Sequence, residues 1–241
     1  FIPPAPHDAG SAMGAALLTQ HLLLKHPRCA PLTHALLGPE FSNDAVRRAL
    51  EASKVRYEQR PDIAADVADL LAQGRVVAWF QGRMEWGPRA LGSRSILADP
   101  TRPEMQATLN QLIKHREPFR PFAPSVLAER VQDYFALSQP SPFMQLVASV
   151  RPERRCEIPA VVHVDGTARV QTVTQESNPL YWRLIKLFEE KRGVPLVLNT
   201  SFNVDGEPIV CTPEDAIRCF FSPGLDALAI GDYIVKKTWF Q

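Results

Sequence analysis

The stretch from Gly82 to Ser95 constrains this chain most, because it packs three arginines and three glycines into fourteen residues. It directly follows the apolar run 76–80, which predicts a buried strand. Glycine permits tight turns and close approach of the backbone to a ligand, and Arg offers a planar fork of donors that matches phosphate or carboxylate oxygens. The segment therefore predicts an anion-binding loop at a strand end, with Arg83, Arg89 and Arg94 as its cations. The alternative is a solvated basic turn.

The composition is that of a globular protein with a local excess of positive charge. Of the 241 residues, 45% are hydrophobic and 22% are charged, which suffices for a large core. The formal net charge is only +1, so no global field draws the molecule to nucleic acid or to an anionic membrane. Between Arg83 and Arg120, however, seven Lys and Arg face four acidic residues. We expect the anion site in this part of the chain.

Cysteine usage and hydropathy point to the cytoplasm. The four cysteines form no C-x-x-C pair and have no histidine at metal-ligand spacing, so neither a zinc site nor a disulfide framework is expected; they are Cys29, Cys156, Cys211 and Cys219. No run approaches the roughly 18 apolar residues of a membrane span, and the N-terminus lacks the layout of a signal peptide. A reducing cytosol fits this pattern best.

The N-terminal part differs in character from the rest. Residues 1–10 read as the interior of a longer protein, a strong helix is predicted over 12–26, and residues 27–41 are turn-rich and unpatterned. We therefore expect a boundary near residue 42, with residues 1–41 as a remnant of one domain plus a linker and residues 42–241 as a second domain.

Helical and strand patterns alternate through the second domain, which predicts an α/β fold. The helices are expected over 63–73, 104–114, 179–192 and 212–221. The strands are expected over 76–80, 144–150, 160–164, 168–173, 195–198, 227–230 and 233–235, and 119–127 is expected to be extended and buried. The turn Asp165-Gly166 predicts that 160–164 and 168–173 form a hairpin.

Three separate segments carry cations where loops meet strands or helices, and we expect them to converge on one phosphate. They are Arg83/Arg89/Arg94, then Lys114/Arg116/Arg120, then Arg169, with Asn199, Thr200 and Ser201 as uncharged donors. The alternative is that Lys114 and Arg116 complement a helix C-terminal dipole while Arg120 and Arg169 are surface charges. No Ser-His-Asp arrangement, G-x-G-x-x-G or P-loop is present, so covalent catalysis, a dinucleotide fold and a Walker-type NTPase are not indicated.

Four ordered segments resemble the C-terminal region of the NodU/CmcH-type O-carbamoyltransferases. They are GRMEWGPRALGSRS at 82–95, KHREPFRPFAP at 114–124, HVDGTARVQT at 163–172 and LNTSFN at 198–203. The resemblance covers about residues 1 to 237. It implies a YrdC-like α/β domain with a twisted mixed sheet and flanking helices, preceded by the helical remnant of an actin-like, ATPase-fold domain.

The resemblance also implies a reaction and roles for residues. The YrdC-like domain would take carbamoyl phosphate and ATP, form carbamoyl adenylate and release phosphate and pyrophosphate, and the actin-like domain would pass the carbamoyl group to a hydroxyl-bearing small molecule. Lys114, Arg120 and Arg169 would hold carbamoyl phosphate. Asn199 and Ser201, with Thr200 between them, would touch the carbamoyl group or the nucleotide phosphates, and Arg89 would lie near the ATP phosphates, with Arg83 and Arg94 in the same loop.

Metals enter through the same resemblance. Mg²⁺ would arrive with ATP. The segment 6–16 is similar to the last motif of the actin-like domain, where Asp8 would contribute to a divalent-metal site, for which iron is one candidate. The remaining ligands would lie outside this chain, so the site is incomplete here.

Two other functions stay open at this point. YrdC-like domains are associated with tRNA modification, so an RNA-binding module is the first alternative, against which the near-neutral charge argues. An inactive regulatory domain is the second. The acceptor and the oligomeric state do not follow from the sequence.

Overall fold

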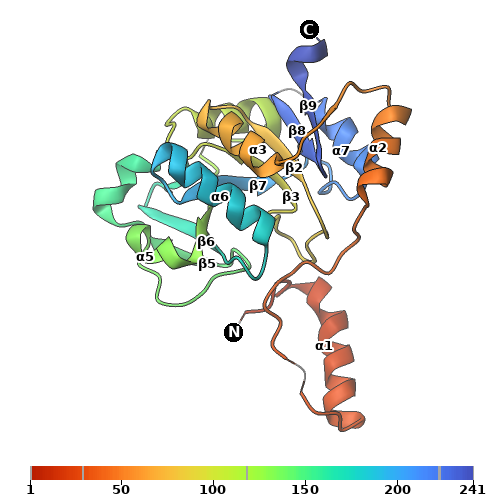
Figure 1. The fold of residues 1–241 in the computed structure, drawn as a ribbon. Coiled ribbons are helices and arrows are strands. Elements are labelled where there is room, and N and C mark those ends of the chain that lie inside the picture. The colour runs from red at the N-terminus through yellow and green to blue at the C-terminus, as the bar shows by residue number, and fades with distance from the viewer. Residues whose placement is uncertain (1, 29, 118, 222–223, 241) are drawn as a thin grey trace.

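The computed structural model describes residues 2–28, 30–117, 119–221 and 224–240. Within them, one sheet of nine strands runs in the order β1-β9-β8-β2-β3-β7-β4-β6-β5 (Figure 1). The strands are β1 (Glu58–Gln59), β2 (Val77–Phe80), β3 (Arg94–Ala98), β4 (Ala123–Leu127), β5 (Leu146–Ser149), β6 (Thr167–Val173), β7 (Leu196–Ser201), β8 (Ala227–Ile230) and β9 (Tyr233–Lys236). The pairs β2–β8 and β4–β6 are parallel and the others antiparallel, so the sheet is mixed.

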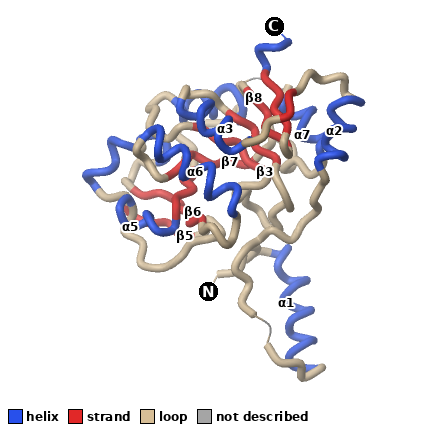
Figure 2. The backbone as a smooth tube through the Cα atoms, in the orientation of Figure 1, coloured by secondary structure: helices blue, strands red, loops and turns tan. Residues whose placement is uncertain are grey.

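Helices cover both faces of this sheet (Figure 2). The helices are α1 (Ser11–Leu18), α2 (Asn43–Ala52), α3 (Ile63–Ala72), α4 (Met105–Leu109), α5 (Val131–Tyr134), α6 (Pro179–Arg192) and α7 (Pro213–Phe220). Helices α3 and α6 pack on one face, where their apolar side chains form a core with Trp79, Leu97 and Val197. The opposite face forms a second core with residues of α2, α4, α5 and α7. The predicted α/β fold with a mixed sheet and flanking helices is therefore confirmed.

Capping and backbone chemistry explain where the helices begin and end. Asn178 accepts a hydrogen bond from the backbone of Tyr181 and Pro179 follows it, so α6 begins there, and Gly193 with φ +75° ends it. Thr212 and Asp215 form a reciprocal capping box at the start of α7. The predicted helix 104–114 is α4 followed by a π-helical turn, Asn110–Lys114.

One predicted strand is wrong. Residues 160–164 do not form a strand, because Pro159–Val161 make a 3₁₀ turn and β5 occupies the edge of β6 with which they were expected to pair. The tight turn at 163–166 exists, since the backbone N–H of Gly166 donates to the carbonyl of His163. The antiparallel partner of β6 is β5 instead of 160–164, and β4 pairs with its other edge.

The N-terminal part divides into an exposed helix and a docked segment. Helix α1 and the π-helical turn Thr19–Leu23 contain no buried residue and project away from the sheet (Figure 1). By contrast, the backbones of Ala35, Gly38 and Pro39 exchange hydrogen bonds with the loop between β2 and β3. The segment expected to be a linker therefore contacts the loop that the sequence singles out. Cys29, part of the cysteine analysis, lies outside the described residues.

None of the helices in the described residues is long and apolar enough to cross a membrane.

Candidate functional site

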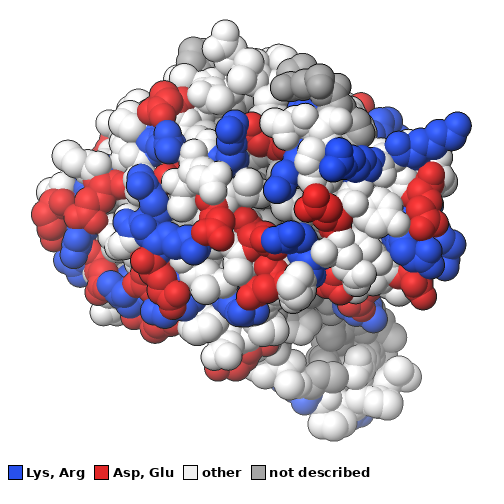
Figure 3. Space-filling view, turned by 45° about the horizontal axis from the view of Figure 1, so that its top comes forward, with Lys and Arg blue, Asp and Glu red and all other residues white. Residues whose placement is uncertain are grey.

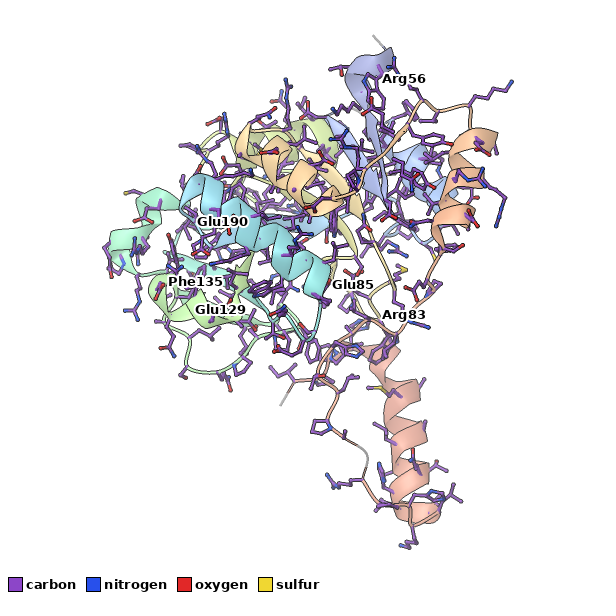
Figure 4. All side chains as sticks on the ribbon, in the orientation of Figure 1. Arg56, Arg83, Glu85, Glu129, Phe135 and Glu190 are labelled. Carbon is purple, nitrogen blue, oxygen red and sulfur yellow. The ribbon has the colours of Figure 1, made fainter. Side chains whose placement is uncertain are left out.

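The loop between β2 and β3 is organised around the buried carboxylate of Glu85 (Figure 4). Its Oε1 accepts hydrogen bonds from the backbone N–H groups of Leu91 at 2.6 Å, Ser93 at 2.7 Å and Arg94 at 3.4 Å. Burial raises the pKa of Glu85, and the backbone hydrogen bonds oppose that rise. Because these N–H groups turn inward, they are taken up by the protein itself. The loop presents side chains, not these amides, to an anion.

Close packing explains one glycine of the loop. Gly92 has φ +104°, and a Cβ at this position would lie 2.2 Å from the ring of Tyr181. Its role is to let helix α6 approach the loop, which differs from the expected approach to a ligand.

Two of the three loop arginines do not reach a common pocket. Arg94 is completely buried, with its guanidinium 3.6 Å from the centre of the Phe80 ring, and it donates to the carbonyls of Gln81 and Gly82. Burial lowers the pKa of Arg94 to about 10. Arg83 is exposed, donates to the carbonyl of Gly38 and lies 3.5 Å from Glu40 (Figure 4). The structure thus places Arg94 in the core and Arg83 against the N-terminal segment.

Arg89, the third, lines a small pocket together with Arg116 and Arg169. The pocket has a volume of about 100 Å³ and is predominantly polar. Its walls come from the β2–β3 loop, the segment before β4, β6 and the end of β7, and they include Pro88, Ala90, Pro121, Phe122, Ala123, Met144, Asn199, Thr200 and Ser201. Segments far apart in the sequence therefore converge here, and the pocket holds six of the residues that the sequence singled out.

The three guanidinium groups of this pocket, Arg89, Arg116 and Arg169, have no acidic partner. Among the described residues, no Asp or Glu oxygen lies within 4.0 Å of any of them. Burial, with the charges of Arg89 and Arg116 in addition, lowers the pKa of Arg169 to about 10. Burial also lowers the pKa of Arg89 and that of Arg116. Positive charges that disfavour one another and lack a carboxylate make a pocket suited to an anion.

A buried polar network holds the floor of the pocket in place. The Asn199 side-chain amide donates to the carbonyl of Ala90 at 3.1 Å, to Ser125 at 3.0 Å and to Gln171 at 3.1 Å. The Gln171 amide in turn donates to the carbonyl of Leu91 at 2.8 Å, so two neighbouring carbonyls of the Arg89 loop are anchored to the sheet. The β4–β6 and β4–β7 registers place these three polar side chains on the face of α3 and α6.

Lys114 lies behind the pocket and supports the end of β7. Its Nζ contacts the carbonyl of Ser201 at 2.6 Å, and both the carbonyl and the side-chain oxygen of Asn203 at 2.9 and 2.8 Å. Three acceptors within 3 Å match the three donors of an ammonium group. Burial, followed by the charge of Arg116, lowers the pKa of Lys114 to about 7. The side chain thus carries a charge that is easily lost.

Arg120 and Asp8 lie apart from the pocket walls. The Arg120 side chain is half exposed and pairs with Glu117 at 2.9 Å, although its charge is close enough to Arg116 to lower that pKa. Asp8 is exposed in a 3₁₀ turn, and the described residues contain no group of three or more His, Cys, Asp or Glu able to hold a metal ion. Asp8 therefore belongs to no complete site within them.

A larger groove of about 720 Å³ lies elsewhere, between the N-terminal segment and the strands β5 and β6. It is mainly apolar and is lined by residues of 31–33, 139–146 and 172–177, none of which, within the described chain, is Lys or Arg. It lacks the charge to hold a phosphate, so the smaller pocket is the candidate site.

The sequence reasoning missed the residues that organise the site. The sequence patterns predict no role for Glu85 beyond its negative charge and none for the side chains of Ser125, Gln171 and Asn203. The sequence carries one usable signal, since Ser125 stands inside the segment 119–127, which is expected to be buried. A buried polar side chain must find a hydrogen-bond partner, so such positions indicate a polar network.

Comparison with known proteins gives one family. The family model described as carbamoyltransferase C-terminus matches residues 68–237. The chain is 45% identical to nodulation protein NolNO of Sinorhizobium fredii over 98% of its own length and 36% of that protein. It is 36% identical to 3'-hydroxymethylcephem-O-carbamoyltransferase of Amycolatopsis lactamdurans over its full length and 44% of that enzyme. The chain thus spans less than half the length of these curated relatives.

Among solved structures, the chain is similar to full-length HypF in a phosphate- and nucleotide-bound form. The TM-score is 0.46, the identity 19%, and the match covers 76% of this chain and 22% of that one.

Proposed function

This chain belongs to the carbamoyltransferase C-terminal family, and from that premise we propose that its arginine pocket binds the phosphoryl groups of carbamoyl phosphate and ATP. The observation that carries the proposal is the set of three partly buried guanidinium groups without a carboxylate partner, Arg89, Arg116 and Arg169. Arginine binds phosphate oxygens two at a time, and a charge-assisted hydrogen bond is strongest where water is excluded.

The proposed reaction forms carbamoyl adenylate. Water cleaves carbamoyl phosphate to carbamate and phosphate, and a carbamate oxygen then attacks the α-phosphorus of ATP while pyrophosphate leaves. Both substrates are anions that repel one another, so the pocket contributes by holding them together and by stabilising charge on the leaving groups. The donors proposed for this work are Arg89, Arg116 and Arg169, with the backbone and side chains at the end of β7.

In this proposal, Lys114 and Asn199 support residues of the pocket and do not contact the substrate themselves. Lys114 holds Ser201 and Asn203 in place through its three short contacts, and Asn199 keeps Ala90, next to Arg89, against the sheet. Arg120, which lies outside the pocket walls, would break its ion pair with Glu117 in order to bind substrate. The supporting role proposed for Lys114 differs from the direct contact with carbamoyl phosphate that the family resemblance implies for it.

Metal ions have a limited place in the proposal. Mg²⁺ would be bound mainly by the phosphates of ATP, since the described residues offer no cluster of acidic ligands. Transfer of the carbamoyl group to a hydroxyl acceptor, and the metal site to which Asp8 would contribute, are proposed for an actin-like domain. Residues 1–41 would be its last part.

Exchange of labelled pyrophosphate into ATP, dependent on carbamoyl phosphate, tests the proposal. Wild-type protein should catalyse it, and Arg169→Met should reduce it about 100-fold, because a charged hydrogen-bonding group is lost from the pocket. The matched control is Arg183→Met on α6, whose partner is Asp62 on the surface. Equal losses in the two variants, or no exchange by the wild type, would contradict the proposed function.

A further inference from the structure

Asn110 is a buried polar residue at the start of the π-helical turn that leads into the site. It is 1% exposed and stands between the buried Leu109 and the remainder of the turn Asn110–Lys114. A π-turn adds a residue to the helical register and frequently occurs at functional sites. His115, which ends the turn, has φ +42°, so the chain reverses sharply immediately before Arg116.

Asn110 forms hydrogen bonds with the segment after the turn through its backbone carbonyl and through both polar atoms of its side-chain amide. Its carbonyl accepts hydrogen bonds from the backbone N–H groups of His115 and of Arg116, the latter at 3.2 Å. Its side-chain Oδ1 accepts a hydrogen bond from Nε of Arg116 at 2.7 Å, and its Nδ2 donates to the carbonyl of Arg120 at 3.0 Å. One side chain thereby links a pocket arginine to the backbone of the segment that leads to β4.

The contact determines both the direction and the charge of Arg116. The guanidinium is held at Nε by Asn110 and lies 4.7 Å from the centre of the Phe122 ring, and both Arg116 and Phe122 line the pocket. With Nε occupied, the terminal nitrogens remain as the pair of donors for a ligand. Because the acceptor is a neutral amide oxygen, the positive charge of Arg116 is not cancelled.

A carboxylate in the same place would have the opposite effect. Arg60 shows this on the surface, where Nε and a terminal nitrogen both bind Asp66 at 2.7 Å. Such a bidentate pair occupies the donors and neutralises the charge.

We propose that Asn110 is a positioning residue of the anion pocket, which aims Arg116 at the bound phosphoryl group while leaving its charge available. The inference rests on the proposed function and deepens it. It assigns to a residue outside the pocket a share of the affinity for phosphate.

A double-mutant cycle tests this inference, with inorganic phosphate as the probe and calorimetry at constant pH as the measurement. Asn110→Leu, similar in volume, should weaken phosphate binding about fivefold in the wild-type background and have almost no effect in the Arg116→Met background. Asn110→Asp keeps the acceptor but adds a charge, so it should weaken binding about tenfold while the protein still melts cooperatively. It also serves as the informative variant if Asn110→Leu fails to fold.

The possible results distinguish a failure of the positioning role of Asn110 from a failure of the arginine pocket to bind phosphate. Equal losses on Asn110→Leu with and without Arg116, or phosphate binding by Asn110→Asp as tight as in the wild type, would overturn the positioning role while leaving the arginine pocket intact. Absence of phosphate binding by the wild type would overturn the pocket itself. Loss of binding confined to proteins that retain Arg116 supports the inference.

Discussion

The cations of the pocket and the cations on the solvent side of helix α6 behave as two different groups. On the outer side of this helix, Arg183 pairs with Asp62 at 2.6 Å and Lys191 with Asp69 at 2.7 Å. Figure 3 shows basic and acidic side chains interspersed over the surface that it presents. In the pocket, Arg89, Arg116 and Arg169 stand together without such partners.

Position in the fold, more than residue type, decides what an arginine does in this protein. An exposed ion pair is screened by water and contributes little to stability. A group of cations gathered in one pocket costs the fold free energy, because burial disfavours the charged form and like charges repel. A cost of this kind at one place is typical of a site that binds an anion.

Adding a carboxylate to the pocket should have the largest effect, because it gives the pocket cations the acidic partner that the surface cations already have. Thr200→Asp at the end of β7 places a negative charge among the pocket guanidinium groups and should weaken phosphate binding by about 100-fold or more. The unfolding temperature should rise, since the cations gain a partner. Thr200→Asn, almost identical in shape but uncharged, is the control, measured by calorimetry and thermal melting. If both variants bind phosphate equally, charge does not govern the pocket.

The titration of Lys114 should have a smaller, pH-dependent effect. Its pKa is about 7 in the folded protein against an ordinary 10.5, so folding releases its proton between these values. Stability from this group should therefore rise with pH across that window, because the unfolded chain binds the proton and the folded one does not. As the pH rises through about 7, sulfate binding should weaken about threefold, since the folded site loses a positive charge and a support for Ser201.

Sulfate is the suitable ligand because it does not titrate in this range. The two opposite trends are measured by urea unfolding and by calorimetry between pH 6 and about 9, below the pKa of about 10 of Arg169. Lys114→Met should remove both pH dependences. A wild-type sulfate affinity that stays constant across the window would show that Lys114 does not support the pocket.

The smallest effect is expected at the surface pair. Arg183→Met should lower the free energy of unfolding by about 0.5 kcal/mol or less, and the difference should shrink at high salt. Phosphate affinity should not change. Urea unfolding at two salt concentrations measures the change in the free energy of unfolding. A loss above about 2 kcal/mol would show that the Arg183–Asp62 ion pair contributes strongly to stability, which would contradict the contrast with the pocket.

Much of the fold could be predicted from local patterns. The buried strand before the loop, the helices over 63–73 and 179–192, and the closing strands 227–230 and 233–235 all follow from periodicity, caps and turn residues. The failure at 160–164 has a physical cause. A short apolar run is compatible with a strand or a buried turn, and only the partner strand decides between them.

The site was less accessible to such reasoning. Arg89 and Arg169 could be picked out as cations at strand ends, but nothing local separates Arg89 from Arg94, five residues later. Arg94 instead lies over Phe80 in the core, since β3 begins at that residue and turns its side chain inward. The roles of Asn110 and Glu85 depend on partners that the loop brings to them.

Local sequence sets which residue types are available and where regular structure begins and ends, because propensity, capping and hydrophobic period act over a few neighbouring residues. It also carried the four motifs of the family. Only the tertiary structure decided which cations share a pocket, which have a carboxylate and which lie in the core. These distinctions depend on distances and burial between segments as far apart as Arg89 and Arg169, and Coulomb energy and desolvation are functions of that geometry alone.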